Sequence, residues 1–140
     1  MNVSEIRLRD ISVKSSSLEV VNDESEGGVY RVNFGDISLL PDNDENGNWL
    51  HTEISAVAQG YPNGIDPESG AEPAFEAKLS LVISYECNFE EEVTEKFYSD
   101  NRWFFNNFIH VAVKISLDNL FKNSAINAID PPWSPAFIKE

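Results

Sequence analysis

The chain has few of the features that mark secreted or membrane proteins. Its 140 residues include one cysteine, Cys87, so no disulfide can form within the chain, and a single cysteine is typical of a reducing compartment. No window reaches the roughly eighteen continuous apolar residues that a membrane-spanning helix needs. The N-terminus, MNVSEIRLRD, contains no apolar run that could serve as a signal peptide. We therefore expect a cytoplasmic protein.

Basic residues are also scarce. The chain has 10 lysines and arginines against 24 aspartates and glutamates, which gives a net charge of −14. Nucleic acids and anionic membranes would be repelled by such a surface, so both are excluded as partners. The acidity favours basic or positively patched partners, or else it serves only to keep the protein in solution.

The sequence lacks the common motifs of catalysis and cofactor binding. It contains no G-x-S-x-G, no phosphate-binding loop, no H-E-x-x-H and no dinucleotide fingerprint. Cys87, His51 and His110 do not have the spacing of any zinc motif. We therefore expect no enzymatic activity, no catalytic residues, no metal site and no cofactor.

Alternating apolar residues predict four strands, at roughly 3–20, 29–40, 49–60 and 75–92. The phase of the alternation changes near Asp10, which predicts a bulge there, and again at Gly35-Asp36. In the fourth strand one face is apolar and the other largely polar, from Leu79 to Phe89. This pattern is typical of an antiparallel sheet that is covered on one side.

The period then changes to that of a helix, predicted at roughly 101–121 with Asp100 or Asn101 as its cap. The stripe expected to face the sheet consists of Phe104, Phe108, Ala112 and Ile115, widened by Phe105 and Ile109. The opposing polar line consists of Asn106, His110, Lys114 and Asp118. A proline-rich tail, 130–140, follows. The predicted fold is α+β, a single domain over residues 1–140, with one long C-terminal helix packed on a four-stranded antiparallel sheet.

One stretch, PDNDENGNWLHTE at 41–53, matches the loop of a calcium-binding helix-loop-helix. Such a loop needs a helix on each side, whereas both flanking segments here alternate as strands do. We therefore predict a β-hairpin, in which Asn46-Gly47 supplies the positive φ angles of a tight turn. Weak calcium binding to the acidic tip, 42–53, is left open.

Two patches resemble the SecB family of export chaperones. The first strand reads IRLRDISVKSS, with Asp10-Ile11-Ser12 at its centre, and the closing part reads NRWFFNNFIHVAVKISLDNLFKNSAINAIDPPWSP. The resemblance implies a SecB-like homotetramer, a dimer of dimers, that holds unfolded or aggregation-prone polypeptides in apolar grooves without ATP. Members of the family pass precursors to a SecA-type motor through acidic residues, among which Asp10 carries over, and some SecB-like proteins instead guard an antitoxin.

The chain also departs from the SecB pattern. Where the family has a second acidic residue, four places after Asp10, this sequence has Lys14. The stretch FEEEVTEKFY replaces the family's glycine-containing segment after the last strand, and the short crossover helix is curtailed. The holding function is therefore better supported by the resemblance than the export role is.

Several aromatic residues lie outside the predicted core stripe, and these are the candidate client-binding residues: Phe75, Phe97, Tyr98, Trp103, Trp133 and Phe137. Aromatic groups off the core-facing positions are what a binding groove would use, although some must close the edges of the core. The leading hypothesis is an ATP-independent holdase. The alternative is an acidic immunity or inhibitor protein that binds one basic partner, such as a toxin or nuclease. The sequence does not distinguish a homodimer from a homotetramer.

Overall fold

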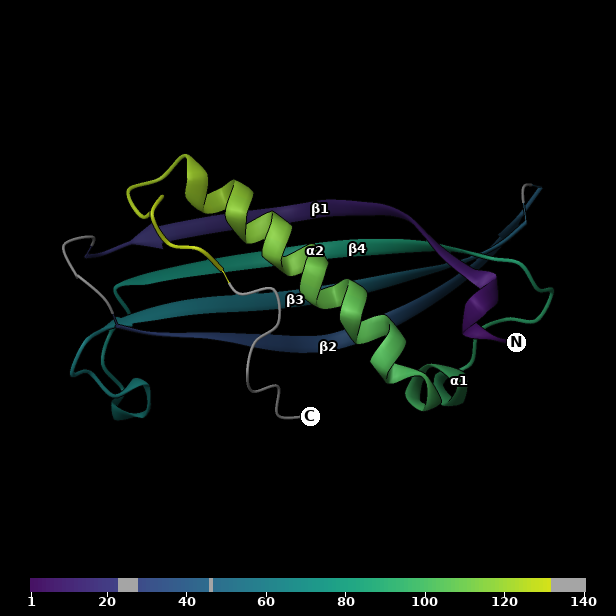
Figure 1. The fold of residues 1–140 in the computed structure, drawn as a ribbon, viewed down its shortest axis with the longest axis horizontal. Coiled ribbons are helices and arrows are strands. Elements are labelled where there is room, and N and C mark those ends of the chain that lie inside the picture. Colours follow the sequence, from purple (N-terminus) through teal and green to yellow (C-terminus); the bar gives the residue numbers. More distant parts are fainter. Residues whose placement is uncertain (23–27, 46, 132–140) are drawn as a thin grey trace.

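Four long antiparallel strands form a single sheet, and two helices lie on one of its faces (Figure 1). A computed structural model describes residues 1–22, 28–45 and 47–131. The strands are β1 (Ile6–Val20), β2 (Gly28–Asp44), β3 (Gly47–Pro62) and β4 (Phe75–Cys87), in the order β1-β4-β3-β2. Short 3-10 helices cover Val3–Glu5 and Pro67–Ser69. The predicted fold class, a SecB-like sheet with a C-terminal helix packed on it, is confirmed.

Three register shifts interrupt the sheet. One lies between Val13 and Ser15 of β1, and the other two lie where the sequence changes phase. The register of β1 with β4 shifts between Leu8 and Asp10, as predicted. The register of β2 with β3 shifts between Phe34 and Ile37, at Gly35. A Cβ added to Gly35 would lie 2.1 Å from the hydroxyl oxygen of Ser55, so a larger residue at this bulge would require the Ser55 side chain to rotate.

The acidic turn is a hairpin between β2 and β3. Asp44 pairs with Gly47, whose φ of 128° is one that favours glycine. Strands lie on both sides of this turn, so the hairpin interpretation is confirmed and a calcium-binding helix-loop-helix is excluded. Asn46 lies outside the described residues. Among those residues, no group of three or more histidine, cysteine, aspartate or glutamate side chains could hold a metal ion.

The fourth strand ends earlier than predicted, at Cys87 rather than near residue 92. The side-chain amide of Asn48 donates to the carbonyl oxygens of Phe89 (3.0 Å) and Glu91 (2.7 Å), and these bonds hold the chain after the strand in a bend. A short helix follows, α1 (Glu95–Asp100), which is not among the elements predicted from the sequence. Its N-cap is Thr94, whose hydroxyl oxygen accepts a hydrogen bond from the Phe97 amide.

The long helix, α2 (Arg102–Lys122), packs on the sheet with part of the predicted face, because Phe105, Ile109 and Ala112 are buried as predicted. Its buried apolar residues are Phe105, Ile109, Ala112, Val113, Leu117 and Phe121. Ile115, predicted to face the sheet, is 43% exposed, so the buried face is displaced by about one residue, roughly 100° around the helix. The observed face continues to Leu117 and Phe121, whereas the predicted stripe gives way to Asn119.

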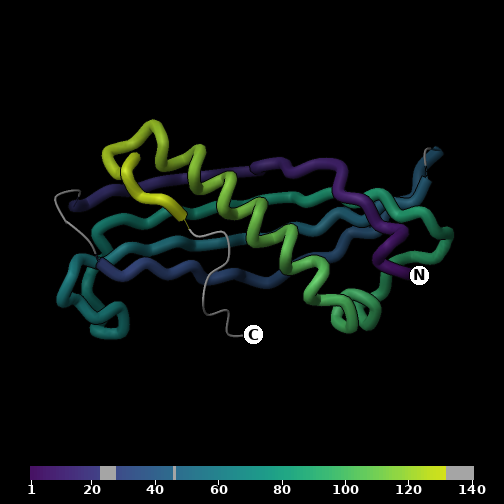
Figure 2. The backbone as a smooth tube through the Cα atoms, in the orientation of Figure 1, coloured from purple at the N-terminus to yellow at the C-terminus, as the bar shows by residue number. Residues whose placement is uncertain are grey.

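Lys114 is buried rather than part of an exposed polar line. Its ammonium group pairs with the carboxylates of Asp118 (3.0 Å) and Asp130 (2.5 Å). The hydrogen bond with Asp130 is the main cause that raises the pKa of Lys114, so the side chain stays charged. Asp130 reaches this position because the chain turns back after α2, where the Ser124 amide donates to the carbonyl oxygen of Phe121 (Figure 2).

Neither helix, nor any other helix within the described ranges, is long and apolar enough to cross a membrane.

Candidate functional site

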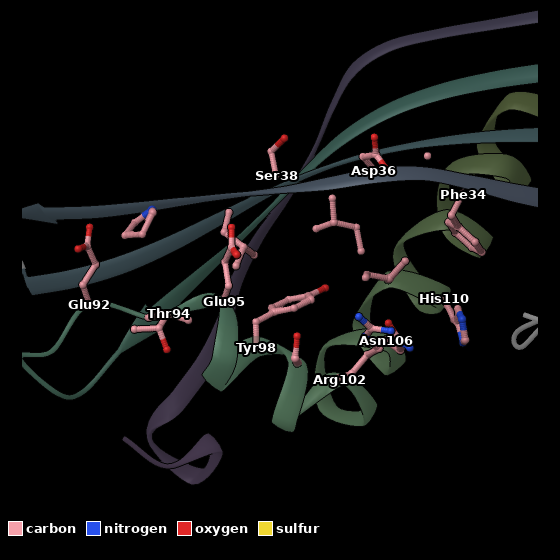
Figure 3. Close-up of a pocket in the computed structure, with 17 residues that line it drawn as sticks. Phe34, Asp36, Ser38, Glu92, Thr94, Glu95, Tyr98, Arg102, Asn106 and His110 are labelled. Carbon is pink, nitrogen blue, oxygen red and sulfur yellow. The ribbon is translucent and has the colours of Figure 1, made fainter. Parts of the chain in front are cut away.

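A hollow lies between the edge strand β2 and the two helices (Figure 3). We call it the β2–helix groove, and its volume is about 970 Å³. One wall consists of Phe34–Leu39 and Pro41, from β2. The other wall comes from the segment before α1, from α1 itself and from the first turns of α2: Glu92, Val93, Thr94, Glu95, Tyr98, Ser99, Arg102, Asn106, Ile109 and His110.

The groove is apolar where β2 faces the helices. Ile37 and Leu39 pair with the buried residues Ile54 and Thr52 of β3, so their side chains lie on the helix-covered face of the sheet. Both are only half-buried, and Ile109 faces them from α2. The partly open aliphatic side chains of the β2 wall can accept an apolar side chain from a partner.

Tyr98 contributes a hydrogen-bond donor to this apolar site. Its side chain is buried, and its ring stacks on Phe105 with 4.5 Å between the ring centroids. Figure 3 shows the hydroxyl pointing into the space between β2 and α2, and it has no hydrogen-bond partner among the described residues. Burial raises the pKa of Tyr98, so the hydroxyl keeps its proton and can donate to a carbonyl oxygen. An unpaired buried hydroxyl is costly, and a bound polar group would relieve that cost.

Charged groups lie at the border of the groove. Three are acidic, Asp36, Glu92 and Glu95, and one is basic, Arg102. Desolvation lowers the pKa of His110, so its ring is neutral near neutral pH, and it lies 6.0 Å from the ring of Phe34. The groove therefore has an apolar floor and a mainly acidic border.

A second, smaller cavity of about 280 Å³ lies where β2 begins. Its walls come from the starts of β2 and β4, the end of β3 and the link after α2: Asn22, Gly28, Val29, Tyr30, Gly60, Tyr61, Pro62, Ala74, Phe75, Ala125, Ile126, Ala128 and Ile129. The link after α2 therefore lies beside the start of β2.

The structure separates the six predicted client-binding residues. Tyr98 lines the β2–helix groove. Phe75 lies in the core, 5% exposed, with its ring 5.4 Å from that of Phe121. Phe97 is half-buried on α1 and contacts Phe89, with 6.3 Å between the ring centroids. Of these three, only Tyr98 is among the residues that line the groove.

Trp103 is exposed, with 62% of its surface accessible, and it is not among the residues that line the groove. Trp133 and Phe137 lie outside the described residues. Asp10, the predicted partner-binding residue, is exposed on β1 at the bulge and pairs in register with Ser84.

Trp103 belongs to an apolar stripe on the surface of α2. We call this set the outer stripe, and it comprises Trp103, Phe104, Phe108, Val111 and Ile115. Val111 and Ile115 are 36% and 43% exposed, and the two phenylalanines are half-buried. A contiguous exposed apolar stripe is typical of a surface that contacts another protein.

Sequence reasoning missed the β2 wall of the groove. Ile37 and Leu39 were assigned to a strand, but nothing in the sequence shows that this strand lies at the edge of the sheet beside the helices. Thr94 before Glu95 is a helix-start signal that would have located α1 and hence the opposite wall.

No protein-family model matches the chain, and no curated protein sequence does. A solved structure does match: the Mycobacterium tuberculosis Rv1957 SecB-like chaperone in complex with a ChAD peptide from the Rv1956 HigA1 antitoxin. The TM-score is 0.67, with 13% sequence identity over 97% of this chain and 92% of the other. The fold is SecB-like.

At 13% identity the match establishes the SecB-like fold alone. The resemblance read from the strand around Asp10 and from the closing helix is thereby confirmed at the level of the fold.

Proposed function

We propose that the chain is an ATP-independent holdase that binds extended, apolar segments of unfolded or aggregation-prone polypeptides in the β2–helix groove. The observation that carries the proposal is the buried hydroxyl of Tyr98, unpaired among the described residues, beside the half-buried Ile37 and Leu39. An extended polypeptide offers what this site lacks, an apolar side chain together with a backbone carbonyl. No catalytic step or cofactor is needed for such binding.

The energetics suit a holdase. Burial of one aromatic or aliphatic client side chain contributes roughly 1.5–3 kcal/mol, so a few contacts give useful affinity without a sequence code. The acidic border, with Asp36, Glu92 and Glu95, adds charge around a loaded groove and favours solubility of the complex.

The SecB-like neighbour was solved with an antitoxin peptide. We therefore propose an antitoxin segment as one class of client. Export is the less favoured role: Asp10 is exposed and could contact a SecA-type motor, but Lys14, also exposed, adds a positive charge nearby. A like charge facing a basic partner weakens association.

We further propose that the chain forms a homodimer or homotetramer through the outer stripe. An exposed tryptophan and two exposed aliphatic residues on one helix favour burial against another copy. No residue of the outer stripe lines the groove, so contact through the stripe would leave the groove open.

Adjacent leucines on β2 provide the test. Leu39 lines the groove, whereas Leu40 is 44% exposed and absent from the groove wall. In an aggregation-suppression assay with several unrelated unfolded proteins, we expect Leu39→Ser to reduce protection severalfold and Leu40→Ser to leave it unchanged. Equal effects of the two substitutions would refute the groove as the client site. If the chain protects none of the unfolded proteins but binds one folded basic partner tightly, the result would favour the inhibitor alternative.

A further inference from the structure

The link after α2 runs back along the helix toward the β2–helix groove. Ile126 and Ile129 line the second cavity together with the start of β2, so the link lies on the β2 side of α2 (Figure 2). Asp130 is then held by Lys114, one helical turn from His110 in the groove wall. The described chain ends at the fully buried Pro131, the residue after Asp130.

The sequence continues after Pro131 with nine residues, PWSPAFIKE. This segment has the composition of a client: three large apolar side chains, Trp133, Phe137 and Ile138, and no net charge. Pro132 and Pro135 favour an extended backbone, which lowers the entropy lost on binding. Its neutrality also avoids repulsion by the acidic border of the groove.

The segment is long enough to cover the groove. An extended chain spans at most about 3.3–3.6 Å per residue, so nine residues reach about 30 Å. The distance along α2 from Lys114 to Arg102, the α2 residue of the wall farthest from Lys114, is about 18 Å at 1.5 Å per residue.

We propose that residues 132–140 bind in the β2–helix groove as an internal competitor of clients, which must displace them. The inference rests on the proposed function of that groove. It reassigns Trp133 and Phe137 from the wall of the groove to its occupant. The Lys114–Asp130 ion pair holds the segment beside the groove, where its effective concentration is of millimolar order. A weak intrinsic affinity then suffices to cover the apolar floor when no client is bound.

The test uses the full-length chain and a fluorescently labelled peptide, PWSPAFIKE. The double variant Trp133→Ser/Phe137→Ser removes the internal occupant, and Phe137→Ser alone is a milder form of the same change. By fluorescence anisotropy, we expect the double variant to bind the peptide at least tenfold more tightly than the unmodified chain, and the single variant to lie between them. Equal affinities for all three would overturn the inference.

A matched pair of substitutions locates the binding. Asn106 lines the groove, whereas the adjacent Asn107 is exposed and outside it. In the double variant, we expect Asn106→Trp to weaken peptide binding tenfold or more and Asn107→Trp to change it less than twofold. Equal effects would place the peptide elsewhere and overturn the inference.

An unfolded client protein separates this inference from the proposed function. If the peptide binds with the expected pattern but the double variant does not protect unfolded clients, the result would support residues 132–140 as the internal competitor and refute the holdase. Protection of clients without preferential peptide binding by the double variant would support the holdase and refute the internal competitor.

Discussion

The two sides of α2 carry similar side chains in different surroundings. The buried side contains Phe105, Ile109 and Val113, and the outer stripe contains Phe108, Val111 and Ile115. Phe105 is fully buried, whereas Ile115 is 43% exposed. A helix that is apolar on nearly all sides indicates burial on more than one side. The comparison shows that packing on the sheet decides which side of the helix becomes core. The other side remains available for contacts between chains.

The largest expected difference between the two sides is in their contribution to the free energy of unfolding. Phe105→Ala should lower the free energy of unfolding by about 3–5 kcal/mol, because a fully buried ring is removed. Phe108→Ala should cost less, about 1–2 kcal/mol, because that ring is half-buried and contacts Tyr85 at one edge. Urea denaturation measures both. Equal losses would mean that the two sides of the helix are equally part of the core.

The next test concerns the outer stripe. Ile115→Asp places a charge on this exposed surface, so we expect the proposed oligomer to dissociate while the fold is retained. Light scattering gives the molar mass and circular dichroism the secondary structure. Asn127→Asp, at an exposed site in the link, adds the same charge away from the stripe and should not change the mass. An unchanged mass with Ile115→Asp would place the contact between chains elsewhere.

A smaller effect is expected on the pH dependence of stability, which His110 links to the groove side of α2. Desolvation lowers the pKa of His110 in the folded state below its usual value of 6.5. The unfolded chain then binds a proton that the folded chain does not, so stability falls as the pH decreases from near 7 through the folded-state pKa. His110→Gln should remove part of this loss, as thermal unfolding between pH 7 and 5 can show. The same replacement at His51, outside the groove, is the matched comparison, and an identical change there would argue against the role of the groove.

The smallest effect is expected at the hairpin tip. Asp42→Ala with Asp44→Ala should change the free energy of unfolding by less than about 0.5 kcal/mol, because exposed turn carboxylates contribute little. Calcium should not alter this result. Tight calcium binding by calorimetry, lost in the double variant, would contradict it.

The secondary-structure elements could be predicted from the sequence better than their arrangement could. Alternation predicted the strands, and its breaks predicted the irregularities near Asp10 and Gly35. The buried face of α2 was predicted only in part, because Phe104 and Phe108 have the same spacing as Phe105 and Ile109, and only the packed sheet selects between them. The buried Lys114 was missed because its partner Asp130 comes from a link whose path the sequence does not reveal.

The candidate site was predicted in part for a similar reason. Off-stripe aromatic residues pointed to Tyr98, but also to Phe75, which is buried in the core. The groove forms where an edge strand meets two helices. Periodicity gives no strand order, so the contributions of Ile37 and Leu39 could not be predicted.

The strand order also affects how the chain folds as it is synthesised. β2, β3 and β4 pair with their neighbours in sequence, so they can form soon after they are made. β1 ends at Val20, but its only partner in the described sheet, β4, begins at Phe75. Non-local pairing of this kind raises contact order and slows folding. β1 is thus left unpaired during synthesis until β4 has followed, and an unpaired strand edge stays open in the nascent chain until then.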